Sequence, residues 1–135
     1  MKKSRLLNSE LSCEISKIGH TAHLTLCDAG LPIPSDVKRI DLAIEKGYPS
    51  FVKTLDAILS EMMVEEIIIA KEIHEKNPEI YIEMMNLFKN HNMSPKITEV
   101  SHEEFKSIPK SSEAIVRTGE CTPYANVILK SGVTF

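Results

Sequence analysis

A histidine, a cysteine and an aspartate surround a short apolar segment near the start of the chain. His20 comes before the segment, and Cys27 and Asp28 close it. The run from Leu24 to Cys27 predicts a short strand, so Asp28 falls at the carboxyl end of that strand. In open α/β sheets, ligands bind outside the carboxyl ends of the strands, which makes Asp28 a candidate site residue. Histidine exchanges protons near neutral pH, so His20 is a candidate acid or base. The alternative is that His20 is a solvated loop residue and that Asp28 only caps the segment that follows.

Two further polar segments lie beside predicted strands. The segment 117–126 joins the last two predicted strands and contains Tyr124 and Asn126, whose side chains donate and accept hydrogen bonds. Its glycine and proline shape the backbone, and a conformationally restricted loop of this kind, dense in polar groups, suits recognition of a polyhydroxylated ligand. His102 lies in the first turn of a predicted short helix, directly after another strand. Taken alone, the loop could be a decorated turn and His102 a surface residue.

Other chemistry at the first strand has less support. A metal site would need four ligands to converge on one ion, namely His20, His23, Cys27 and Asp28. Cys27 and Asp28 point to opposite faces of a strand, so they do not meet easily. A phosphocarrier histidine would need an adjacent basic residue, and none stands next to His20. The thiols of Cys27 and Cys121 are expected to be small buried groups rather than nucleophiles.

Size and composition limit the class of protein. The 135 residues predict one domain over the whole chain, 1–135, with a proper core. The net charge of −3, without a basic stripe, argues against a nucleic acid partner. No apolar run approaches the roughly 20 residues that span a bilayer, and no secretory signal is expected. Three cysteines without close pairing indicate reduced thiols. We therefore expect a cytoplasmic protein that is not inserted in a membrane.

Hydrophobic spacing predicts helices and strands in alternation. Helices are expected over 10–18, 51–59, 71–75 and 77–89, with a short one after Ser101. Asn8 or Ser9 is expected to cap the first of them, Ser50 the second and Ser101 the last. Strands are expected over 24–27, 39–44, 65–70, 96–100, 114–117 and 127–129. This alternation predicts an α/β fold, a three-layer sandwich with a largely parallel central sheet flanked by helices.

Together, these segments resemble the D-ribose pyranase family of ribose and fucose mutarotases. The resemblance runs essentially end to end, although residues 71–96 match only in pattern. The motifs that carry it are Gly19-His20-Thr21, Cys27-Asp28-Ala29-Gly30-Leu31-Pro32-Ile33-Pro34, Arg39-Ile40-Asp41-Leu42, Ser101-His102-Glu103-Glu104-Phe105-Lys106, Arg117-Thr118-Gly119-Glu120, Pro123-Tyr124-Ala125-Asn126 and Gly132-Val133-Thr134-Phe135.

The resemblance implies an enzyme that interconverts the pyranose and furanose ring forms of D-ribose without a cofactor. It also implies a homo-oligomer, a decamer of two pentameric rings, with each site near a subunit boundary. The family's proton-transfer histidine matches His20. The residues that match its sugar contacts are Asp28, His102, Tyr124, Ala125 and Asn126.

One position departs from the family pattern. The family commonly has Gly-His-Thr-Asp, and this chain has Ala22 in place of the aspartate, followed by His23. If that carboxylate orients or charges His20, the pH profile of the reaction is shifted unless His23 or Asp28 compensates. The alternative is that the position is a solvated cap and that Ala22 is neutral.

Ring interconversion suits these residue types. Opening the hemiacetal needs a base for the anomeric hydroxyl and an acid for the departing ring oxygen, and one histidine can serve both steps. We expect His20 to shuttle the proton and Asp28 to hold a sugar hydroxyl or an imidazole N–H, while Tyr124 and Asn126 fix the sugar. Two alternatives remain open: a mutarotase for another sugar such as fucose, and a non-catalytic sugar-binding accessory of a ribose transporter.

Overall fold

The computed structural model describes residues 1–135 and contains one six-stranded sheet. The strand order is β2-β5-β1-β6-β3-β4. The strands are β1 (His23–Cys27), β2 (Lys38–Asp41), β3 (Val64–Ala70), β4 (Lys96–Val100), β5 (Ala114–Arg117) and β6 (Val127–Ser131). β6 runs antiparallel to both of its neighbours, and the other pairs are parallel. The predicted largely parallel sheet is confirmed.

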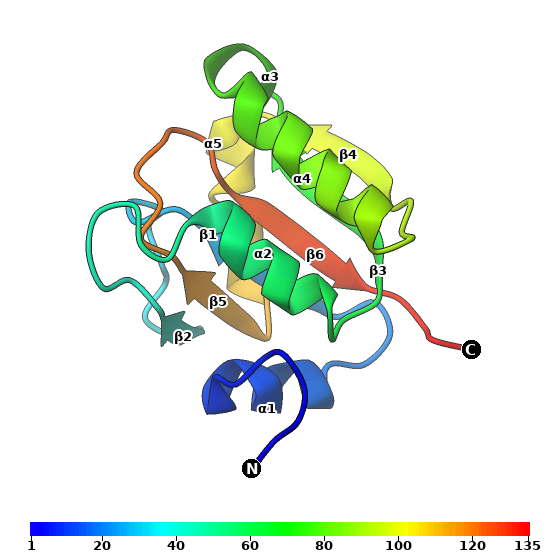
Figure 1. The fold of residues 1–135 in the computed structure, drawn as a ribbon. Coiled ribbons are helices and arrows are strands. Elements are labelled where there is room, and N and C mark those ends of the chain that lie inside the picture. The colour runs from blue at the N-terminus through cyan, green and yellow to red at the C-terminus, as the bar shows by residue number, and fades with distance from the viewer.

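Helices cover the two faces of the sheet unequally. On one face, α1 (Ser9–Lys17), α2 (Phe51–Leu59) and α4 (Pro78–Asn90) enclose a core cluster of 22 buried residues. Figure 1 shows α2 and α4 side by side across this face. The other face carries a cluster of only six buried residues, under α5 (His102–Phe105) and the 3-10 helix η1 (Ile108–Ser111). The sandwich therefore has three layers, as predicted, with one outer layer much thinner than the other.

Residues of the central strands alternate between the two faces of the sheet and so contribute to both cores. In β1, Leu24 and Leu26 belong to the larger core, whereas Cys27 belongs to the smaller one. In β3, Ile67 and Ile69 face the larger core, and Ile68 between them packs half-buried against the smaller one. Successive strand residues point to opposite faces, so these central strands are apolar on both sides.

Three of the helices begin at the polar residues that the sequence predicts as caps. Asn8 Oδ1 accepts from Leu11 N at 2.9 Å before α1. Ser50 and Ser101 likewise cap α2 and α5, with their hydroxyl oxygens accepting backbone N–H groups one turn on. A short helix, α3 (Ile73–Lys76), precedes α4 and begins two residues later than predicted.

The predicted strand 39–44 is too long at its end. β2 stops at Asp41, because the carboxylate of Asp41 accepts a hydrogen bond from Ala43 N at 3.1 Å and turns the chain. An isolated bridge between Glu45 and Tyr48 follows, so these residues form a loop at the carboxyl edge of the sheet.

No helix in the structure has both the length and the apolar character needed to cross a lipid bilayer.

Candidate functional site at the carboxyl edge of the sheet

Asp28 and Asn126 form the centre of a polar cluster at the carboxyl edge. Asp28 follows β1 and Asn126 precedes β6, and these neighbouring strands are antiparallel, so both residues reach the same edge. Asn126 Nδ2 donates to Asp28 Oδ2 at 2.8 Å, and Asp28 N donates to Asn126 Oδ1 at 2.9 Å. The other carboxylate oxygen of Asp28 accepts from Gly30 N at 2.8 Å. Asn126 is 1% exposed. Its buried amide therefore has one orientation, and it holds the Asp28 carboxylate in place.

Tyr124 and His102 stand beside this pair. Their rings meet edge to face, with centroids 4.9 Å apart and an interplanar angle of 85°. Tyr124 has a φ of 59°, a left-handed conformation that side chains other than glycine seldom adopt. An open cavity of about 280 Å³ lies against these groups. Its lining includes Asp28, Leu31, Pro32, His102, Pro123 and Tyr124.

His102 is held by its backbone and leaves one ring atom free. Both carboxylate oxygens of Glu72 accept from His102 N, at 3.0 and 3.1 Å, and this contact lowers the pKa of the Glu72 carboxyl. His102 Nδ1 is buried without a hydrogen-bond partner. Buried polar atoms are normally paired, so the unpaired Nδ1 marks His102, which lines the cavity, as a candidate ligand contact.

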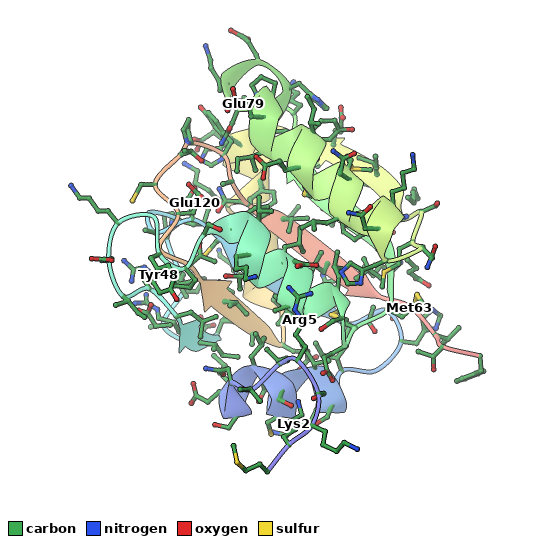
Figure 2. The ribbon with its side chains drawn as sticks, in the orientation of Figure 1. Lys2, Arg5, Tyr48, Met63, Glu79 and Glu120 are labelled. Carbon is green, nitrogen blue, oxygen red and sulfur yellow. The ribbon has the colours of Figure 1, made fainter.

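The loop before Asn126 is built on a buried carboxylate. Glu120 accepts hydrogen bonds from the backbone N–H groups of Phe51, Cys121 and Thr122, at 3.1–3.2 Å. Its backbone oxygen accepts from Ala29 N at 2.8 Å, next to Asp28. Figure 2 shows Glu120 beside the amino end of α2. Glu120 therefore ties the loop to both α2 and the turn that carries Asp28.

His20 lies at the opposite edge of the sheet. It precedes β1, and Asp28 follows it; β1 spans five residues. At about 3.3 Å per residue, the strand alone separates the two by about 16 Å. His20 Nε2 lies 2.8 Å from Glu65 Oε2 on β3, and the two side chains are 51% and 37% exposed. Lys130 lies 3.4 Å from the other oxygen of Glu65. These contacts lower the pKa of Glu65, with the His20 hydrogen bond as the larger cause.

A cavity of about 340 Å³ adjoins His20, and its lining includes the apolar side chains of Met63, Val133 and Phe135. Met63 and Glu120 mark the two edges in Figure 2, at opposite ends of the strands.

The predicted site residues therefore fall into two groups within one chain. Asp28, His102, Tyr124 and Asn126 come together, with Ala125 buried between the last two, whereas His20 stands apart from them. Because His20 and Asp28 lie at opposite edges, the four-residue metal site considered from the sequence is not assembled.

Sequence reasoning missed Glu65 as the partner of His20. His23 and Asp28 make no hydrogen bond to His20; the pKa of His23 is lowered by burial and by nearby Lys130. Glu65 was visible only as the start of a predicted strand, and nothing in its spacing indicated contact with His20.

The fold and the carboxyl-edge cleft define a small α/β protein whose polar cleft suits a hydroxyl-rich ligand. The chain matches the model of the RbsD / FucU transport protein family over residues 1–134, and it belongs to that family. It is 74% identical to a D-ribose pyranase of Rhodopirellula baltica, over the full length of both chains.

Two solved structures share the fold. One is the RbsD of Bacillus subtilis complexed with D-ribose, with a TM-score of 0.92 and 44% identity over all of both chains. The other is the fucose mutarotase of Streptococcus pneumoniae in complex with L-fucose, with a TM-score of 0.83 and 28% identity, covering 96% of this chain and 95% of that one. The family resemblance predicted from the sequence is confirmed.

Proposed function

We propose that the protein is a D-ribose pyranase, which interconverts the β-pyranose and β-furanose forms of D-ribose and feeds ribose catabolism. The observation that carries the proposal is the Asp28–Asn126 pair in the carboxyl-edge cleft, in a chain that is 74% identical to a D-ribose pyranase. The structural relative that contains D-ribose supports the same substrate. Such an enzyme belongs to the intramolecular isomerases and needs no cofactor for this reaction.

The cleft supplies the groups that bind the sugar. The Asp28 carboxylate accepts a hydrogen bond from a sugar hydroxyl, and the Asn126 amide keeps that carboxylate in position. His102 Nδ1 and the Tyr124 hydroxyl engage further hydroxyl groups. Because the carboxylate and the amide are already fixed, little ordering is needed when the sugar binds.

His20 acts on a sugar held by a neighbouring copy of the chain. It sits about 16 Å from the cleft of its own chain, which is too far for proton transfer. A second copy solves this if its amino edge docks on the carboxyl edge of the first. Such a head-to-tail contact is heterologous and closes into a ring, as a decamer of two pentameric rings requires.

Apolar side chains at both edges support this docking. Ile44 is 76% exposed, and Tyr48 is also exposed, in the loop at the carboxyl edge. Met63, Val133 and Phe135 are exposed apolar residues at the amino edge. Apolar side chains left in solvent at two complementary edges are typical of protein interfaces.

In this assembly, His20 opens the ring by general acid–base catalysis. It takes the proton of the anomeric hydroxyl and returns a proton to the departing ring oxygen, and the open aldehyde recloses through a different hydroxyl. Glu65 accepts the Nε2 proton of His20, which orients the ring and leaves Nδ1 to exchange protons with the sugar. Glu65 thereby does what the family's aspartate at position 22 would do in this chain. Cys27 is buried, as the sequence predicts, whereas Cys121 is exposed, so the prediction that it is buried was wrong. The three free cysteines agree with a cytoplasmic location.

Saturation-transfer NMR on ribose tests this function. Magnetisation should pass between the pyranose and furanose anomeric protons in the presence of the protein, and His20→Ala should abolish most of that transfer. Ribose binding without exchange would identify the non-catalytic accessory instead. Faster exchange on fucose than on ribose would identify the fucose mutarotase.

A further inference from the structure

Asn77 contacts the sugar-binding loop from a distant part of the chain. It stands directly before α4, at the position where asparagine usually caps a helix with its own side chain, yet it makes no such cap. Instead, Nδ2 donates to Thr122 Oγ1 at 2.9 Å and to the backbone oxygen of Pro123 at 2.8 Å. Asn77 is only 8% exposed. Both protons of its amide are therefore used on the loop and not on the helix.

A directed chain of hydrogen bonds continues from Asn77 into the loop. The Thr122 hydroxyl accepts from Asn77 and donates to Glu120 Oε1 at 3.0 Å, and Glu120 in turn accepts from Phe51 N at the start of α2. A hydroxyl has one proton, so the direction of this chain is fixed. The loop is thus clamped between the amino ends of α4 and α2.

The hydrogen bonds from Asn77 to Thr122 and Pro123, which we call the clamp, end at the residue before Tyr124. Tyr124 adopts a left-handed backbone conformation, which persists only where the surroundings hold it. Asn77 fixes Thr122 and Pro123 on one side, and the Asp28–Asn126 pair fixes the other side. The strained residue that faces the cleft is therefore secured from both ends.

We propose that Asn77 is a positioning residue for sugar binding: its amide holds Thr122 and Pro123 so that Tyr124 meets the ligand already in place, beside the carboxylate that Asn126 holds. This inference rests on the proposed function. Asn77 itself does not line the cavity, so its contribution to the affinity for the sugar is indirect. Loss of the clamp leaves the loop to be ordered by the sugar, which weakens binding and leaves the proton transfer at His20 unchanged.

The variant Asn77→Asp tests this with almost no change in shape. Aspartate caps helices as well as asparagine does, so α4 keeps its start, but a carboxylate cannot donate to Thr122 or Pro123. We expect KM for ribose to rise about tenfold, with kcat within about twofold of the wild type, because two hydrogen bonds are lost. Asn77→Ser, which also caps helices but is too short to reach the loop, should behave alike without adding a charge.

Asn86→Asp is the matched control. Asn86 lies on the same helix, exposed and without a hydrogen-bond partner, so it carries the same change of charge. Its kinetic constants should equal those of the wild type. Thr122→Val added to Asn77→Asp should raise KM little further, since both changes break one chain of hydrogen bonds.

Amide hydrogen exchange of the free protein separates failure of this inference from failure of the proposed function. The N–H groups of Thr122, Tyr124, Ala125 and Asn126 should exchange faster in both Asn77 variants than in the wild type, whatever the ligand is. A wild-type protein that neither binds nor converts ribose, with this faster exchange present, would contradict the function and keep the clamp. Unchanged loop exchange and unchanged KM in folded Asn77 variants would overturn the inference. A parallel fall of kcat, affinity and thermal stability would also overturn it, because that pattern marks a purely structural residue.

Discussion

At the carboxyl edge, Asn126 and Asp28 share two hydrogen bonds, and Asn126 is 1% exposed, whereas at the amino edge His20 meets Glu65 with about half of its side chain in solvent. The Asp28–Asn126 pair is held by hydrogen bonds within one chain, with Asn126 buried. The amino edge depends on an exposed contact between His20 and the Glu65 carboxylate, and exposed contacts of this kind typically contribute about 0–1 kcal/mol. The two edges of the same strands are thus held by different interactions.

This difference shows which half of the site one chain can complete alone. The binding cleft is already organised within the chain, because Glu120, Glu72 and Asn126 position its parts. In the proposed assembly, the half of the site that contains His20 is completed only when another copy covers it. Substitutions at one edge at a time should therefore separate effects on ribose affinity from effects on the exchange rate.

Replacing His20 should have the largest effect. His20→Ala should lower the rate of pyranose–furanose exchange by about 10²–10⁴-fold, the usual contribution of one acid–base group, with ribose affinity largely kept. Saturation-transfer NMR measures the rate and calorimetry the affinity. His91→Ala is the control, because His91 contacts Asp56 on α2 and neither edge of the site. An unchanged exchange rate in His20→Ala would remove the amino edge from the reaction.

Replacing Asn126 should have the next largest effect, on binding. Asn126→Ala leaves the Asp28 carboxylate and the part-buried Asp28 N–H without their partner, which costs about 1–3 kcal/mol. Ribose affinity measured by calorimetry should fall about tenfold to hundredfold. The exposed Asn90, changed to alanine, should bind as the wild type does. Near-normal affinity in Asn126→Ala would contradict the binding role of the cleft.

Removing the charge of Glu65 should have a moderate effect on the rate alone. Glutamine can still accept the hydrogen bond from His20 but gives a neutral contact, and charge-assisted bonds are about twice as strong. Glu65→Gln should lower kcat about tenfold and leave KM unchanged. Glu61→Gln, which changes another carboxylate at the cavity that adjoins His20, serves as the control. A rise in KM instead would place Glu65 in sugar binding.

The smallest effect concerns stability at the amino edge. The Thr98 hydroxyl, with Lys96 and Lys130, lowers the pKa of Glu66 to about 2 from an ordinary value of 4.5. A lowered pKa in the folded state means that ionised Glu66 stabilises the fold fully above about pH 4.5, and that this contribution is lost as the pH falls toward 2. Glu66→Gln should therefore flatten the decline in the free energy of unfolding across this range. Denaturant unfolding at several pH values measures it, and parallel curves for both proteins would disprove the assignment.

The sequence predicted the local elements well, because their signals are local. The Ile67–Ile69 run, the caps at Ser50 and Ser101 and the position of Asp28 after β1 all depend on near neighbours, and the structure confirms them. The early end of β2 was missed because a side-chain bond from Asp41 outweighed the apolar alternation.

The supporting residues of the site could not be predicted from the sequence. Glu65 reaches His20 and Asn77 reaches Thr122 across 45 residues each, and Glu72 reaches His102 across 30. These contacts depend on the strand order, which places β6 between β1 and β3. The hydrophobic periodicity of a sequence does not show which distant strands pair with one another. The candidate ligand residues could be named, whereas the residues that hold them could not.

The central claim is that one catalytic site combines the amino edge of one copy with the carboxyl edge of the next. It is tested most directly by co-expressing His20→Ala and Asn126→Ala chains and measuring exchange at ribose concentrations below KM. In randomly mixed rings, about a quarter of the sites would pair an intact His20 with an intact cleft, so about a quarter of the wild-type rate should return. A mixture that gives only the average of the two separate variants would contradict the shared site.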